Sequence, residues 1–232
     1  MTMRAIAAGW LIGLPVVWAL NASAATCQPP QEVIEATPDQ VRAFFGKDGR
    51  KVVTFLGYSG AGYDDRPAML RHAGRVLDRL DPKQTLVNIG ATAEGIGAVY
   101  ELAKRRGFTT TGIVSIEAKR AAVELSPCVD YVFYVEDATW GGYLPGTRTL
   151  SPTSEAMVAV SERLLAIGGG EVARDELLAA RQLGKNVTFI AADMDHRLAV
   201  KKAASRGAPL PTDFRGAAHE AMNATAPAGP AR

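Results

Sequence analysis

Short apolar runs alternate with amphipathic stretches between residues 51 and 205, and this alternation constrains the fold more than any other feature. The runs are rich in β-branched residues, which favour strands, and each has the length of a single strand. In the stretch 67–80, by contrast, Met69, Ala73 and Val76 fall on one face at helical spacing. We expect strands at 51–56, 85–89, 110–114, 130–135, 164–167 and 186–191, and helices at 67–80, 94–106, 117–125, 153–163, 172–183 and 195–205.

Strands that alternate with helices form a parallel sheet whose two faces are both covered. The sequence therefore predicts an α/β fold, built on a doubly wound, mainly parallel sheet of about six strands with helices on both faces. Residues 51–207 are assigned to this domain, and 26–50 to an N-terminal lead with a short helix that Thr37 caps and Pro38 begins. Residues 208–232 are rich in Pro, Ala and Gly, and we interpret them as a low-complexity, disordered tail.

The first residues have the features of a targeting segment. Arg4 is followed by a nearly unbroken apolar stretch, 5–20, and then by Ala22-Ser23-Ala24, which fits a cleavage site. The apolar stretch is shorter than the roughly 20 residues that span a bilayer. We therefore interpret 1–25 as a signal peptide and the protein as secreted or periplasmic; an uncleaved N-terminal membrane anchor is the alternative.

Cys27 and Cys128 are the two cysteines of the sequence. An exported chain can pair them, and both precede expected strands, so they would fall at the same edge of a parallel sheet. Two unrelated thiols are the alternative. The formal net charge of +2 is too small to indicate a surface that binds the phosphate backbone of nucleic acid. The three histidines are far apart in the sequence and do not have the spacing of metal ligands. We predict no nucleic-acid partner, no metal site and no cofactor.

Glycine-rich loops follow several of the expected strands, and they are the first candidates for a binding site. In a doubly wound sheet such loops meet at the carboxyl edge of the strands, where ligands bind. The turn Gly168-Gly169-Gly170 precedes a helix that opens with acidic residues. Without Cβ atoms it lets a ligand approach the main chain, and the N–H groups of the helix start attract an anion. The sequence therefore predicts a nucleotide or phosphosugar site here, with Arg174 and Asp175 beside it.

Three other loops add candidate ligand-binding residues. The loop 57–65 offers close backbone approach and a hydroxyl, the turn 90–97 places glycines at a helix start, and the loop 136–143 places an indole beside carboxylates. The predicted ligand-binding residues are Gly57, Ser59, Gly60, Gly90, Thr92, Gly95, Trp140, Gly168, Gly169, Gly170, Arg174 and Asp175. These three loops also have plainer interpretations: a flexible turn with a capping serine, close helix-on-strand packing, and a surface loop whose aromatic lid packs on the core. At the triple-glycine turn, the acids of the following helix could simply complement its dipole.

Two segments resemble the Lonely-guy proteins, often labelled lysine-decarboxylase-like, which belong to a Rossmann-like nucleotide-binding superfamily. Residues 88–99, with Gly107 and 112–114, resemble the glycine-rich strand–helix–strand unit of the family, and 169–177 resembles its Pro-Gly-Gly-x-Gly-Thr-x-x-Glu-Glu motif. The resemblance implies a Rossmann-like fold, usually in a homodimer, and hydrolysis of the N-glycosidic bond of nucleoside monophosphates. It places Glu176 at the first motif glutamate, as the catalytic residue.

The chain departs from the family motif at several positions. Val172 and Ala173 replace the Gly-Thr pair that supports phosphate binding. Ser154 stands where the family has a catalytic arginine three residues before a methionine, here Met157. We therefore expect an exported Rossmann-like domain that binds a nucleotide or phosphosugar. Two alternatives stay open: a nucleoside-monophosphate N-glycosidase, and a non-catalytic envelope interaction protein whose loops are purely structural.

Overall fold

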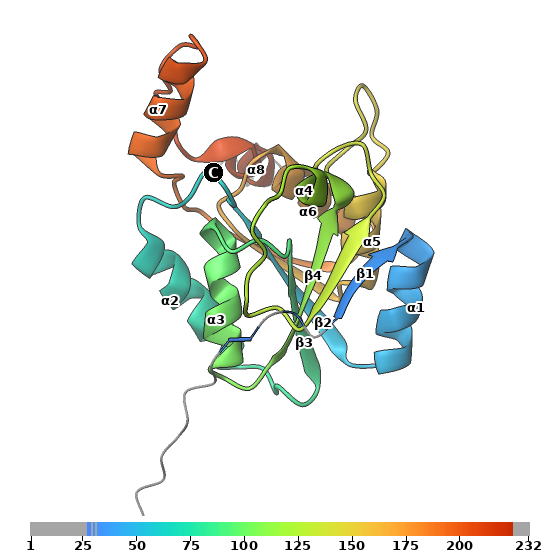
Figure 1. The fold of residues 1–232 in the computed structure, drawn as a ribbon. Helices are drawn as coiled ribbons and strands as arrows, with labels where there is room; N and C mark the ends of the chain where they lie inside the picture. Colours follow the sequence, from blue (N-terminus) through green and yellow to red (C-terminus); the bar gives the residue numbers. More distant parts are fainter. Residues whose placement is uncertain (1–26, 29, 31, 225–232) are drawn as a thin grey trace, which may run out of the picture.

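The structure, a computed structural model, describes residues 27–28, 30 and 32–224. The predicted signal peptide, 1–25, lies outside the described residues. Within them, seven parallel strands form one sheet in the order β1-β5-β4-β3-β2-β6-β7 (Figure 1). The strands are β1 (Glu32–Ala36), β2 (Lys51–Gly57), β3 (Thr85–Ile89), β4 (Thr109–Ser115), β5 (Tyr131–Val135), β6 (Arg163–Ile167) and β7 (Asn186–Ile190).

Helices and one 3₁₀ turn connect these strands, two further helices follow the last strand, and each predicted helix is present in some form. They are α1 (Pro38–Asp48), α2 (Arg66–Leu77), η1 (Gly95–Ala98), α3 (Val99–Lys104), α4 (Ile116–Arg120), α5 (Pro152–Val160), α6 (Glu171–Gln182), α7 (His196–Ser205) and α8 (Gly216–Ala224). Thr37 caps α1 in a reciprocal capping box with Gln40, and Pro38 begins the helix, as the sequence predicts.

The sheet separates two hydrophobic cores. On one face α2 and α3 pack around Phe55, Val87 and Tyr100, and on the other α1, α5 and α6 pack around Leu56 and Leu164 (Figure 1). Phe55 and Leu56 are neighbours in β2 that serve opposite cores, because successive side chains of a strand point to opposite faces. The predicted α/β sheet with helices on both faces is confirmed.

The order of the strands reverses direction at β2. From β2 the chain adds β3, β4 and β5 on one side, and it then crosses through α5 to add β6 and β7 on the other. This reversal is characteristic of doubly wound nucleotide-binding sheets. The chain has a Rossmann-like fold.

Three parts of the secondary structure differ from the expectation. The lead contributes a seventh strand, β1, which pairs with β5 at the edge of the sheet. The expected helices 94–106 and 117–125 are shorter, because Gly95 has φ +58° and Ala122 has φ +49°, values outside the helical region. The expected disordered tail is corrected at 216–224, where α8 packs on α6 and buries Ala218 and Met222.

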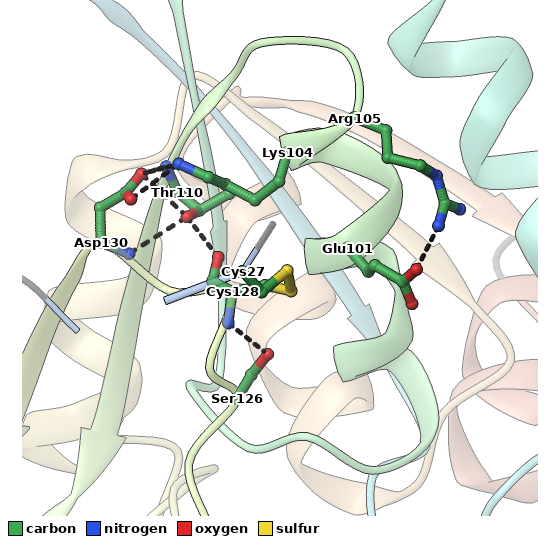
Figure 2. Close-up of a disulfide and its surroundings, with 8 residues drawn as sticks. All are labelled: Cys27, Glu101, Lys104, Arg105, Thr110, Ser126, Cys128 and Asp130. Atoms are coloured by element: carbon green, nitrogen blue, oxygen red, sulfur yellow. Dashed lines mark hydrogen bonds and ion pairs between the residues drawn. A yellow bond between two sulfur atoms is a disulfide. The ribbon is translucent and has the colours of Figure 1, made fainter. Parts of the chain in front are cut away.

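A disulfide joins Cys27 to Cys128 and ties the lead to the amino edge of the sheet (Figure 2). The predicted pairing is therefore confirmed. The segment that carries Cys128 is held in place by Asp130, whose carboxylate accepts hydrogen bonds from Lys104 Nζ at 2.7 Å and Thr110 N at 2.8 Å. Thr110 Oγ1 also donates to the carbonyl of Cys128 at 2.7 Å. Among the described residues, no helix is both long and apolar enough to cross a membrane.

Candidate functional site

A cavity of about 460 Å³ opens at the carboxyl edge of the sheet, where β2 and β3 end and α6 begins. This is the position at which the strand order reverses, and ligands of doubly wound sheets bind there because the loops on the two sides diverge. Most of its wall is apolar. The lining residues are Phe55, Leu56, Gly57, Ser59, Gly60, Ile89, Gly90, Thr92, Glu94, Ile96, Ile113, Val114, Val123, Trp140, Thr153, Met157, Val172, Ala173 and Glu176.

Among the described residues, Glu176 is the one ionisable group of the cavity wall that is buried, with only 3% of its surface exposed. It lies in the second turn of α6, on the face that packs toward the sheet. Burial raises the pKa of Glu176 to about 7, the hydrogen bond from Ser154 opposes this shift, and the charge of Asp175 adds to it. Near neutral pH the carboxyl is thus divided between its two protonation states, so it can both donate and accept a proton.

Ser154 connects Glu176 to the loop that carries Trp140. Its hydroxyl donates to Glu176 Oε1 at 2.6 Å and accepts the N–H of Gly142 at 2.7 Å. The next residue of the loop is held by Asp175, whose Oδ2 accepts the N–H of Tyr143 at 2.9 Å. Two adjacent acidic residues of α6 therefore face the same loop, one through a serine and one directly.

Thr153, in the first turn of α5, lines the same cavity and is nearly completely buried, with 4% of its surface exposed. Its backbone N–H donates to Asp137 Oδ2 at 2.9 Å. Within the described part of the chain, however, its hydroxyl oxygen is buried without any hydrogen-bond partner. A buried hydroxyl without a partner costs free energy, and this oxygen is also almost inaccessible from the cavity.

Asp137 fixes the start of α5 and the start of the Trp140 loop together. Burial raises the pKa of its carboxyl, but hydrogen bonds from Thr153 and Thr139 lower it more, so that the pKa is below its ordinary value. The indole of Trp140 lines the cavity and is 56% exposed. An exposed aromatic ring at the mouth of an apolar cavity is available to cover or stack on a flat ligand.

The structure brings together seven of the residues predicted to form the site. Gly57, Ser59, Gly60, Gly90, Thr92, Trp140 and Glu176 all line the cavity. They come from three loops and α6, which the sheet topology places side by side. Whether a ligand contacts them stays a prediction.

The triple-glycine turn does not line this cavity. A Cβ on Gly168 would lie 2.5 Å from the ring of Tyr58, and one on Gly169 would lie 2.6 Å from the Cβ of Ala173. At these two glycines, the space in which we expected a ligand is therefore filled by protein. Gly170, the N-cap of α6, has no atom within 4 Å of its Cβ position and is open.

Close packing also accounts for Gly95, which is absent from the cavity lining. A Cβ there would lie 2.1 Å from the carbonyl oxygen of Tyr58, and φ is +58°. Arg174 and Asp175 line a second, smaller hollow of about 270 Å³ instead, beneath the loop 141–147. Arg174 Nε donates to Asp175 Oδ1 at 2.8 Å, so the guanidinium is engaged by the neighbouring carboxylate.

Sequence reasoning missed Thr153 as a site residue and treated Ser154 only as a departure from the family motif. In the structure Ser154 contacts Glu176 through its hydroxyl, a contact that the sequence analysis did not predict. Thr153 carried no signal in the sequence, because a threonine at a helix start is explained by capping. Among the described residues, no group of three or more His, Cys, Asp or Glu side chains is arranged to hold a metal ion.

Comparisons with known proteins give no family assignment. No protein-family model and no curated protein matches the chain. Among solved structures, the molybdenum cofactor carrier protein of Chlamydomonas reinhardtii is 20% identical over 60% of this chain and 76% of that chain, with a TM-score of 0.44. The molybdenum cofactor binding protein of Rippkaea orientalis is 16% identical over 60% and 76%, with a TM-score of 0.45. These values are too low to transfer a ligand or an activity.

Proposed function

We propose that this protein binds a small molecule of the nucleotide class, such as a nucleoside, a nucleotide or a phosphosugar, in the cavity at the end of β2. The observation that carries the proposal is the position of the cavity. It lies at the reversal of strand order, and it combines a buried carboxyl, an exposed indole and otherwise apolar walls. A largely apolar cavity with a few convergent polar groups is the usual form of a small-molecule site.

The parts of the cavity suit the parts of such a ligand. The apolar walls accommodate a heterocyclic base, and Trp140 can stack on it at the mouth. Glu176 can accept hydrogen bonds from sugar hydroxyls or from ring N–H groups. Val172 and Ala173, in the first turn of α6, present backbone N–H groups at the positive end of the helix dipole.

Two measurements test the binding proposal. Native mass spectrometry of freshly purified protein should detect a co-purifying small molecule that is lost on denaturation. Titration calorimetry with ribonucleosides, their 5′-monophosphates and ribose 5-phosphate should then give saturable binding for at least one of them. The variant Ile113→Trp, which fills the cavity, should abolish that binding. Absence of heat for every compound at millimolar concentration contradicts the proposal.

Hydrolysis of an N-glycosidic bond is a second candidate function, favoured by the state of Glu176. A carboxyl with a pKa of about 7 can deliver or accept a proton at neutral pH. In this reaction water attacks the anomeric carbon, the bond from that carbon to the base nitrogen breaks, and the base leaves with a proton. Ionised Glu176 would stabilise the cationic sugar or assist the water.

Base release separates binding from catalysis. Chromatography should show free base from the bound nucleoside or nucleotide, and Glu176→Gln should reduce its rate at least about 100-fold, the usual contribution of a general acid or base. A cavity that binds the compound without releasing base supports the binding function alone.

Export of the protein is supported by the disulfide between Cys27 and Cys128, because such bonds persist in oxidising compartments. We infer that residues 1–25 are removed on export. Amino-terminal sequencing of the protein from the periplasmic or secreted fraction should begin close to residue 26. Recovery of the uncut chain from the membrane fraction supports the anchor instead.

A further inference from the structure

Glu176 presents one free carboxyl oxygen to the cavity. The side chain is buried, and its Oε1 accepts the hydroxyl of Ser154 at 2.6 Å. Among the described residues Oε2 has no hydrogen-bond partner, yet this oxygen keeps accessible surface where Glu176 lines the cavity. Hydrogen bonds to a buried carboxylate are stronger than those between neutral groups. A ligand that donates to Oε2 therefore gains binding free energy at this position.

The surroundings of Glu176 suit a flat heterocycle. The residue comes from α6, and four apolar residues of the cavity wall belong to the core that covers this side of the sheet: Leu56, Ile113, Met157 and Ala173. The exposed indole of Trp140 lines the same cavity and offers a face for stacking. We therefore place the base of a nucleoside, rather than its sugar, beside Glu176.

Polar groups for the rest of such a ligand come from the other side of the sheet. Ser59 and Gly60 follow β2 and Glu94 follows β3, in segments that lead to α2 and α3. Ser59 and Glu94 can accept hydrogen bonds from sugar hydroxyls. The Lys202 ammonium donates to the carbonyl of Gly60 at 2.6 Å and stays a cation there. This side of the cavity thus suits the sugar and tolerates a phosphate.

The ionised form of Glu176 limits which base fits beside it. Above its pKa of about 7 the carboxyl only accepts hydrogen bonds, and its two oxygens offer about four acceptor sites, of which Ser154 uses one. Guanine presents two adjacent donors, N1–H and its amino group. Adenine and cytosine place an acceptor nitrogen beside their amino group, and uracil has one N–H between two carbonyls. Guanine is therefore the common base whose donors match a carboxylate.

We propose that Glu176 recognises the two adjacent N–H donors of a guanine base, and that the cavity prefers guanine nucleosides and nucleotides over those of the other common bases. This inference rests on the proposed ligand-binding function and makes Glu176 a specificity-determining residue. It identifies the base and makes no demand on the phosphate.

Calorimetry at pH 8.5 with a series of nucleosides tests the proposal on the unaltered protein. Inosine keeps N1–H but lacks the amino group, so it should bind about tenfold more weakly than guanosine, the effect of one lost hydrogen bond. Adenosine turns an acceptor toward the carboxylate and should bind about 100-fold more weakly. Because the base and not the ribose meets Glu176, 2′-deoxyguanosine should stay within about threefold of guanosine.

Glu176→Gln tests the residue itself. The carboxamide places a donor beside an acceptor, and this pattern matches adenine instead of guanine. Guanosine should bind at least about tenfold more weakly, and its advantage over adenosine should be lost. Glu162→Gln, at an exposed glutamate just before β6 and so at the amino edge of the sheet, is the matched control and should keep the affinities of the parent. Circular dichroism and thermal unfolding show whether both variants are folded.

Three results overturn the inference and leave the proposed function intact. The parent binds adenosine as tightly as guanosine; folded Glu176→Gln keeps the preference for guanosine; or 2′-deoxyguanosine binds as weakly to the parent as every nucleoside binds to Glu176→Gln, which assigns the carboxylate to the ribose. If Glu176→Gln does not fold, the comparison of guanosine, inosine and adenosine in the parent still decides. No binding of any of these compounds overturns the proposed function as well.

Discussion

The hydroxyl of Ser154 lies 2.6 Å from Oε1 of Glu176, and it is the donor that holds this buried carboxyl in the cavity wall. The same oxygen accepts the N–H of Gly142, at the base of the Trp140 loop. The ionisation of Glu176 and the position of that loop are therefore connected through one side chain. Burial outweighs the hydrogen bond from Ser154, so the pKa of Glu176 lies above its ordinary value.

Glu176 should make the stability of the protein depend on pH. Its pKa rises from 4.5, the value of an unperturbed glutamate, to about 7 in the folded chain, so between these values the folded state binds the proton and the unfolded state does not. Stability contributed by this group is present below pH 4.5, falls as pH rises, and is lost above pH 7, by about 3 kcal/mol in all. Urea unfolding from pH 4.5 to 8 should show this fall in the free energy of unfolding. In Glu176→Gln the free energy of unfolding should fall less over the same pH range, by about that amount. Parallel curves for the two proteins would exclude this assignment.

Ser154→Ala should act on both groups that the hydroxyl contacts. Glu176 loses a hydrogen bond that lowers its pKa, and the N–H of Gly142 loses its acceptor. We expect a loss of about 1–3 kcal/mol at pH 8, where the carboxyl is charged, and a smaller loss at pH 5. Urea unfolding at the two pH values measures this difference. Ser205→Ala, at an exposed serine near the end of α7, is the matched control and should change stability little. Equal losses at both pH values would separate the serine from the ionisation of Glu176.

The sequence was sufficient to predict the elements that local chemistry specifies. The Thr37 capping box and the alternation of apolar runs with amphipathic stretches led directly to α1 and the parallel sheet. β1 was missed because it is an edge strand that is largely exposed. Glu32, Val33 and Glu35 are all exposed, so its sequence lacks the apolar run of a buried strand. The helix α8 was missed because its short run of alanines is stabilised by packing on α6, and that packing is a tertiary effect.

The candidate site was predictable in position but only partly in composition. A glycine in a sequence shows that no Cβ is present, but it does not show whether a ligand or another part of the protein occupies the Cβ position. At Gly60 that space borders the cavity, whereas at Gly168 the ring of Tyr58 fills it. Tyr58 is held there by a hydrogen bond of 2.5 Å to the carbonyl of Arg215, which is far away in the sequence. The burial of the Thr153 hydroxyl, which has no partner among the described residues, likewise depends on the neighbours that the fold provides.

Removal of the disulfide should destabilise the chain without changing the cavity, which lies at the opposite edge of the sheet. Cys27 and Cys128 are separated by 101 residues, and a cross-link of that span restricts the unfolded chain strongly. The variant Cys27→Ala/Cys128→Ala should lose about 2–5 kcal/mol in urea unfolding under oxidising conditions. A reductant should lower the stability of the parent to a similar value and leave the variant unchanged. Sensitivity of the variant to the reductant, or insensitivity of the parent, would contradict the role given to this bond.

Gly169 and Gly170 are adjacent, yet alanine should be tolerated at only one of them. At Gly169 the backbone has φ +132°, and a Cβ would lie 2.6 Å from that of Ala173 and 3.4 Å from that of Ala218. Gly169→Ala therefore places a side chain in a disfavoured backbone conformation and against Ala173 of α6, and should cost about 2 kcal/mol or more. At Gly170 φ is −86° and the Cβ position is open, so Gly170→Ala should cost no more than about 1 kcal/mol, which is the loss of a favoured N-cap residue. Thermal and urea unfolding of the two variants measure this contrast. Equal tolerance at both positions would contradict the backbone conformation and the close contact with α6 at Gly169.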